Sequence, residues 1–164
     1  MTQQTLLLVD DETSFLNSMI RALRNEPYIF MVANNGQEAL EILKEFNVDV
    51  VVADYKMPGL NGLNLLKQIR VAYPLVTPIM LTAFCDVNVV LQAVNEIRVY
   101  KFLLKPVKLD DFRITIKFAM KENQSGLYVP PETQLEELYD DLERNFPGIT
   151  TVRCDTDGYY LLEE

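Results

Sequence analysis

The 164 residues of this chain allow one well-cored domain and an appendage, but hardly two full domains. Hydrophobic residues make up 49% and charged residues 24%, as in an ordinary globular protein, and the longest apolar stretches are far too short to span a membrane. Histidine is absent, which excludes histidine-based triads, the usual zinc sites and a phosphohistidine carrier, so carboxylates are the expected reactive groups.

The N-terminus gives no sign of a secretory signal. It passes from MTQQ into a short LLLV run and then acidic residues, without a cationic region or a long apolar core. Cys85 and Cys154 are too few and too far apart to predict a disulfide framework or a metal site. We therefore expect a cytoplasmic protein with reduced thiols.

Short apolar runs alternate with amphipathic stretches along the first 122 residues. The runs predict strands over Leu6 to Val9, Tyr28 to Ala33, Val48 to Val52, Pro78 to Thr82 and Val99 to Leu104. A helix is expected after each strand, with Thr13 or Ser14 capping the first, Asn35 and Gly36 opening the second, Val87 to Ile97 forming the fourth, and Asp110 or Asp111 capping the fifth. This alternation predicts an α/β fold with a doubly wound five-stranded parallel sheet and helices on both faces.

The remaining residues predict a small extension. Residues 1–122 form the main domain, 123–131 (NQSGLYVPP) a linker, and 132–164 a helix with an apolar stripe from Leu135 to Phe146 followed by a β-hairpin over Ile149 to Cys154 and Tyr159 to Leu162. Residues 1–122 carry a charge balance of −1 and residues 123–164 one of −8. The acidic extension is poorly suited to binding the phosphate backbone of a nucleic acid.

The residues that end the predicted strands carry the chemistry. Because parallel strands point the same way, their carboxyl ends gather on one edge of the sheet. Three carboxylates there would raise one another's pKa values unless a cation neutralised them, and hard oxygen ligands suit Mg²⁺. A lysine and a hydroxyl beside a metal-bound aspartate are what a phosphoryl group needs. The residues are Asp10, Asp11, Asp54, Thr82 and Lys105.

Each of these residues also has a structural explanation when it is taken alone. Asp10 and Asp11 could cap the first helix, and Asp54 could cap the following turn. Thr82 could be a β-branched strand end, and Lys105 could be a solvated surface charge. A purely structural origin is hard to sustain for the whole set, because its members end consecutive strands.

The motifs LLLVDDE, DYKMPGLNG, IMLTAF and YKFLLKP resemble the receiver domain of bacterial two-component response regulators over roughly residues 5–122. The resemblance implies the flavodoxin-like strand order 2-1-3-4-5. It also implies that a sensor histidine kinase, or a small phosphodonor, phosphorylates Asp54. Asp11, Asp54 and the backbone carbonyl of Lys56 would hold Mg²⁺, with Asp10 acting through water.

The same resemblance gives the remaining residues their roles. Thr82 and Lys105 would contact the phosphoryl oxygens, Phe102 would be the switch aromatic, and the peptide bond from Lys105 to Pro106 would be cis. Phe102 lacks the hydroxyl of the more common tyrosine, so it could signal only by packing. Lys56 places a cation where the family tunes the lifetime of the phosphoryl group.

Two other readings remain open. An aspartyl-nucleophile phosphatase also combines an α/β sheet, Mg²⁺, a threonine and a lysine, but it generally needs a second acid where this chain has Lys56. A degenerate receiver could serve only as an interaction module, against which the intact acid set argues. For the receiver we expect a downstream protein target or a self-dimer as partner, and no contact of this chain with nucleic acid or membrane. Whether self-catalysed phosphorylation makes it an enzyme is left open.

Overall fold

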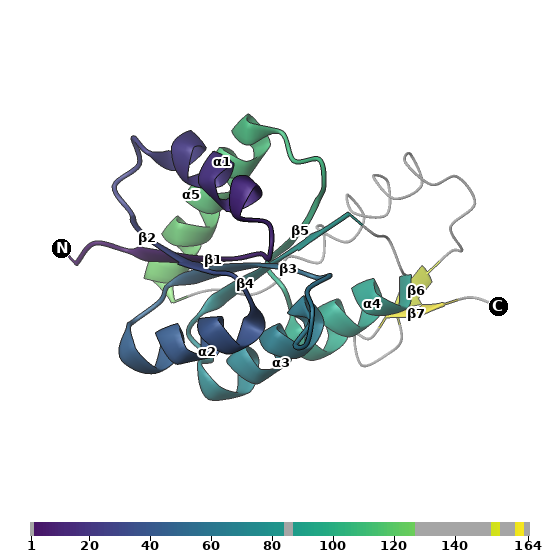
Figure 1. Cartoon of the computed structure of the whole chain (residues 1–164). Helices are drawn as coiled ribbons and strands as arrows, with labels where there is room; N and C mark the ends of the chain where they lie inside the picture. The colour runs from purple at the N-terminus through teal and green to yellow at the C-terminus, as the bar shows by residue number, and fades with distance from the viewer. Residues whose placement is uncertain (1, 84–86, 127–151, 155–159, 163–164) are drawn as a thin grey trace.

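The computed structural model describes residues 2–83, 87–126, 152–154 and 160–162 (Figure 1). One sheet has the strand order β2-β1-β3-β4-β5, and each neighbouring pair is parallel. This confirms the predicted fold and its strand order. The strands are β1 (Thr5–Val9), β2 (Ile29–Ala33), β3 (Val50–Asp54), β4 (Thr77–Thr82) and β5 (Lys101–Leu104).

Helices cover both faces of this sheet. Figure 1 shows α1 (Thr13–Leu23) and α5 (Leu109–Ser125) on one face, and α2 (Gly36–Glu45), α3 (Gly62–Ala72) and α4 (Val87–Gln92) on the other. Neighbouring residues of a central strand point to opposite faces, so a β-branched run such as that of β3 fills two cores at once.

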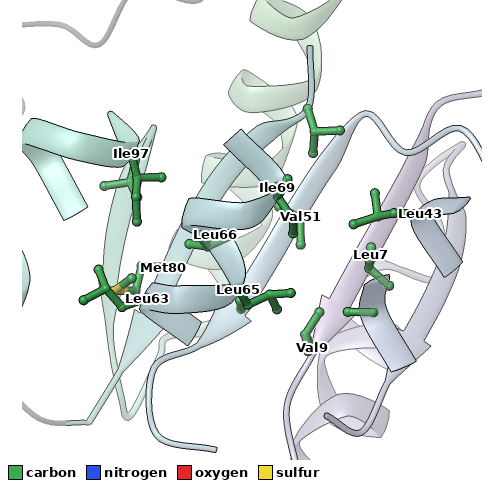
Figure 2. Packing of buried hydrophobic residues seen from close by; sticks show 14 of the residues in the cluster. Leu7, Val9, Leu43, Val51, Leu63, Leu65, Leu66, Ile69, Met80 and Ile97 are labelled. Atoms are coloured by element: carbon green, nitrogen blue, oxygen red, sulfur yellow. The ribbon is translucent and has the colours of Figure 1, made fainter. Parts of the chain in front are cut away.

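The core beneath α2 and α3 shows how closely the layers pack. In Figure 2, Leu7, Val51 and Met80 of the sheet face Leu43 of α2 and Leu66 of α3. All five side chains are buried. Each contributes about 1.5–3 kcal/mol by leaving water, and together such contacts fix the sheet on which the functional residues stand.

Two predicted helix caps are wrong. Helix α1 begins with Thr13 already inside it, and its N-cap residue Glu12 makes no side-chain cap hydrogen bond. Instead a carboxylate oxygen of Asp10 accepts a hydrogen bond from the Glu12 backbone N–H at 2.9 Å. Helix α5 begins at Leu109, so Asp110 and Asp111 lie in its first turn. There their negative charges interact favourably with the positive end of the helix dipole, but neither residue is the N-cap.

The fourth helix departs from regular α geometry. Its predicted range, Val87 to Ile97, is helical throughout, but α4 ends at Gln92 and a π-helical segment, η1 (Ala93–Ile97), continues it. Arg98 then takes a left-handed conformation with φ of 54°, and β5 begins at Lys101, two residues later than expected. The spacing of apolar residues does not distinguish one wider helical turn from an α turn.

Helix α5 runs three residues into the predicted linker and ends at Ser125, with Gly126 as its left-handed cap. The Asn123 amide explains the extra turn, because it donates to the backbone oxygens of Asp49 and Leu75 and to the Thr77 hydroxyl, at 2.8, 2.8 and 3.1 Å. The first residue of the predicted linker is thus hydrogen-bonded to the sheet and to the loop beside it.

The extension is described only at its hairpin. Strands β6 (Val152–Cys154) and β7 (Tyr160–Leu162) pair antiparallel, as the sequence predicts. The helix predicted over Leu135 to Phe146 lies outside the described residues. Among the helices that are described, none has the length and apolar character needed to cross a bilayer.

Candidate functional site

The carboxyl edge of the sheet brings four of the predicted residues together. Asp10 directly follows β1, Asp54 and Thr82 end β3 and β4, and Lys105 directly follows β5. The backbone ladder holds them there, since the Asp10 N–H donates to Ala33 O at 3.1 Å and the Lys105 N–H to Thr82 O at 2.8 Å. Asp10, Asp54 and Thr82 are only 1%, 5% and 3% exposed. Their polar groups are therefore largely removed from bulk water.

The Lys105 ammonium is the cation of this edge. It donates a hydrogen bond to Oδ2 of Asp10 at 2.7 Å and lies 3.5 Å from Oδ2 of Asp54. Burial lowers the pKa of Lys105, but the hydrogen bond to Asp10 and the charge of Asp54 outweigh it, and the net pKa is raised. The amine is thus held protonated beside the two buried acids.

Three carboxylates lie close enough to share one cation. Oxygens of Asp10, Asp11 and Asp54 all lie within 4.8 Å of one another. Burial, and next the charge of Asp10, raise the pKa of Asp54 to about 6, although Lys105 pulls the other way. The single charge of Lys105 does not balance three carboxylates, so the hard oxygen donors fit a divalent cation such as Mg²⁺.

The neighbouring acids Asp10 and Asp11 differ in what they offer such a cation. Both oxygens of Asp10 are already engaged, one by Lys105 at 2.7 Å and the other by the Glu12 N–H at 2.9 Å. Asp11, by contrast, is exposed. This difference suits an indirect role for Asp10 and a direct one for Asp11.

A cleft of about 480 Å³ opens over Asp11 and Asp54. It gives Asp54 access to a ligand even though the side chain is buried. Sequence reasoning gave no site role to four residues of its wall, which are Glu12, Met57, Pro58 and Ala83. The cleft is lined by Asp11, Glu12, Asp54, Lys56, Met57, Pro58, Ala83 and Lys105.

The loop after β3 is pressed against the backbone of Asp54. A Cβ atom at Gly62, the first residue of α3, would lie 2.2 Å from the Asp54 carbonyl oxygen, so no larger residue fits without movement. The Gly62 N–H donates to Tyr55 O at 2.9 Å and closes the loop that carries the exposed Lys56. The sequence marks Gly62 only as a turn residue, whereas in the structure it packs directly against the backbone carbonyl of Asp54.

The other two predicted positions lie on β5 and just after it. Phe102 is partly buried and packs against the core on the α3 side of the sheet. The peptide bond between Lys105 and Pro106 is cis.

Comparison with known proteins agrees with this geometry. The family model of the response regulator receiver domain matches residues 6–117. The hydrogenase transcriptional regulatory protein HoxA of Cupriavidus necator is 32% identical over 119 residues, which are 73% of this chain and 24% of HoxA. The DNA-binding transcriptional regulator NtrC of Escherichia coli is 32% identical over 145 residues, which are 88% of this chain and 30% of NtrC. The chain therefore spans only about a quarter to a third of these relatives.

A solved structure shows the same likeness. The signal receiver domain of an HD domain-containing protein from Pseudomonas fluorescens Pf-5 superposes with a TM-score of 0.73 at 29% sequence identity. The match covers 76% of this chain and 99% of that domain.

The raised pKa of Asp54 predicts how metal-free stability depends on pH. A carboxyl whose folded pKa lies near 6 instead of 3.8 destabilises the fold when ionised, fully above about pH 6 and hardly below pH 4. Replacing Asp54→Asn should therefore raise the free energy of unfolding at pH 8 by roughly 1–3 kcal/mol. The gain should vanish toward pH 4. Urea unfolding with a chelator measures it, and a pH-independent difference would contradict this account.

Proposed function

Because the chain belongs to the response regulator receiver family, we propose that it accepts a phosphoryl group on Asp54 from a sensor histidine kinase or a small phosphodonor. The observation that carries this proposal is the buried Asp54 carboxylate beneath an open cleft, between the Lys105 ammonium and two further acids. Receiver domains are phosphorylated by sensor kinases and typically use Mg²⁺.

The transfer requires little covalent chemistry from the protein. A carboxylate oxygen of Asp54 forms a bond to phosphorus while the bond from phosphorus to the donor's imidazole nitrogen breaks, and the electron pair stays on that nitrogen. Lys105 and the Thr82 hydroxyl contact the phosphoryl oxygens, so the work is positioning and charge stabilisation. Asp11, Asp54 and the Lys56 carbonyl would hold Mg²⁺, with Asp10 acting through water, and the ion would supply further charge neutralisation.

The phosphatase reading is the weaker one. That chemistry needs an acid two residues after the nucleophile to protonate the leaving group. The residue there is Lys56, which lines the same cleft and carries no carboxyl. The proposed activity is thus a signalling phosphorylation of the chain itself.

Intact-mass measurement tests the proposed acceptor. After incubation with acetyl phosphate and Mg²⁺, the wild type should gain one phosphoryl group and Asp54→Asn none, because the nucleophilic oxygen is lost. Asp110→Asn, which removes an exposed carboxylate of α5, is the matched control and should label normally. Labelling of Asp54→Asn would move the acceptor elsewhere, and steady turnover of p-nitrophenyl phosphate would favour the phosphatase.

We further propose that phosphorylation switches the surface formed by α4, η1 and β5. The new phosphoryl oxygens draw the Thr82 hydroxyl inward, and Phe102 follows by packing. Thr82 is the last residue of β4. Phe102 of β5 pairs with Met80, which lies two residues before Thr82 on β4, so a movement of the end of β4 occurs next to the aromatic residue. Couplings of this kind are typically about 1–3 kcal/mol.

Thr82→Ala should still accept phosphate but lose this response, because the methyl group cannot hydrogen-bond to a phosphoryl oxygen. Thr82→Ser keeps the hydroxyl and should respond like the wild type. Amide hydrogen exchange of residues 87–104, measured with and without phosphorylation, reports the switch. A normal exchange change in Thr82→Ala would refute the coupling.

We also propose that residues 127–164 form a separate docking extension with a protein partner, which is their own receiver domain, a second copy or a signalling protein. Their acidic balance opposes nucleic-acid binding by this part of the chain. The DNA binding named for NtrC belongs to that longer protein.

Deleting residues 127–164, immediately after the Gly126 cap, should leave labelling of Asp54 intact, because α5 and the site remain whole. The deletion should change oligomeric state, phosphoryl lifetime or partner binding. Light scattering and dephosphorylation kinetics measure the first two. If neither these nor thermal stability changed, and amides of the extension exchanged as fast as those of a free peptide, docking would be excluded.

A further inference from the structure

Phe15 places an aromatic ring against the cation of the site. It is the third residue of α1, and its ring centroid lies 4.4 Å from Nζ of Lys105. The side chain is half-buried and packs on the core beneath α1 and α5. From its spacing in the sequence alone, Phe15 is one of the apolar residues on the face of α1 that packs on the sheet. In the structure the ring also contacts the Lys105 ammonium, a contact that core packing does not require.

Asp10, Asp54 and Phe15 lie close to the Lys105 ammonium and bind it in different ways. Asp10 accepts one directed hydrogen bond at 2.7 Å, while Asp54, at 3.5 Å, attracts it mainly by charge. The ring of Phe15 attracts the charge through its quadrupole and takes no hydrogen bond from it. Two contacts are therefore insensitive to which way the N–H bonds point.

We propose that Phe15 is a positioning residue for phosphoryl transfer, because its ring holds the Lys105 ammonium at Asp54 while the N–H bonds change partners. This inference rests on the proposed function. In the unphosphorylated site an N–H points to Asp10, whereas the transfer needs one on a phosphoryl oxygen. Since attraction to the ring depends on distance to its face and not on N–H direction, the ammonium can turn without leaving its place.

A leucine tests this role, since it keeps apolar bulk on the core and removes the ring. Phe15→Leu should slow labelling of Asp54 by acetyl phosphate about 2- to 30-fold at saturating Mg²⁺ and donor. The concentrations of Mg²⁺ and donor that give half the maximal rate should stay within about twofold, because Phe15 contacts neither. Phe15→Tyr keeps a ring and should recover most of the rate.

Phe30→Leu is the matched control, because Phe30 is also a partly buried ring on the same core but belongs to β2. It should label at the wild-type rate. The NMR signals of the Lys105 ε-methylene protons give an independent readout that needs no phosphorylation. The ring current of Phe15 should shift them upfield in the wild type and in Phe15→Tyr, and the shift should disappear in Phe15→Leu.

Three results would overturn the proposal and leave the proposed function intact. One is wild-type labelling in Phe15→Leu. Another is equal slowing in Phe15→Leu, Phe15→Tyr and Phe30→Leu, which would assign the effect to core packing. The third is a Lys105 signal that does not depend on the ring. A wild type that takes no label, while a control receiver does, would refute the proposed function and with it this role, whereas the NMR shift would still decide whether the contact exists.

Discussion

The ion pair between Lys105 and Asp10 is the interaction on which the carboxyl edge of the sheet depends. Asp10 is 1% exposed, and an unpaired carboxylate at such a depth would cost several kcal/mol. The Lys105 ammonium offsets this cost by a hydrogen bond of 2.7 Å to Asp10 Oδ2. It lies farther from Asp54, at 3.5 Å from Oδ2. Burial, and next the charge of Asp10, therefore raise the pKa of Asp54 to about 6, because Lys105 at the longer distance only partly offsets them. The sheet thus leaves Asp54, the proposed phosphoryl acceptor, as the buried carboxylate whose charge is less well compensated.

The sheet can hold this arrangement because the groups are fixed by backbone register. Thr82 and Leu104 pair across β4 and β5, and the Lys105 N–H continues the ladder to Thr82 O. On the opposite side Gly62 brings the start of α3 against the Asp54 carbonyl. Packed cores on both faces resist movement of these strands, so mutual repulsion among the acids is relieved by protonation or by a cation more easily than by separation.

The sequence was sufficient for the features that depend on periodicity. The valine run before Asp54, and the polar residues that end or follow β1, β4 and β5, predicted both the parallel sheet and the residues that meet at its edge. Features that depend on a distant contact were not predictable. The Asn123 amide, which lengthens α5, bonds to residues 46 to 74 positions away. Likewise, nothing in the local pattern around Phe15 indicates Lys105, which lies 90 positions along the chain.

The choice of lysine over arginine at position 105 follows from the same geometry. An arginine fork would bind a carboxylate through two parallel hydrogen bonds, and against a buried, fixed Asp10 that pairing would resist exchange. An ammonium is a compact charge with three rotatable donors, and it keeps its attraction to the Phe15 ring and to Asp54 as it turns. In the proposed reaction Asp54 gains a group carrying up to about two negative charges, which competes with Asp10 for the Lys105 ammonium. The site therefore favours a cation that is held in place by charge and by contact with the ring, and whose N–H groups can change their hydrogen-bond acceptor.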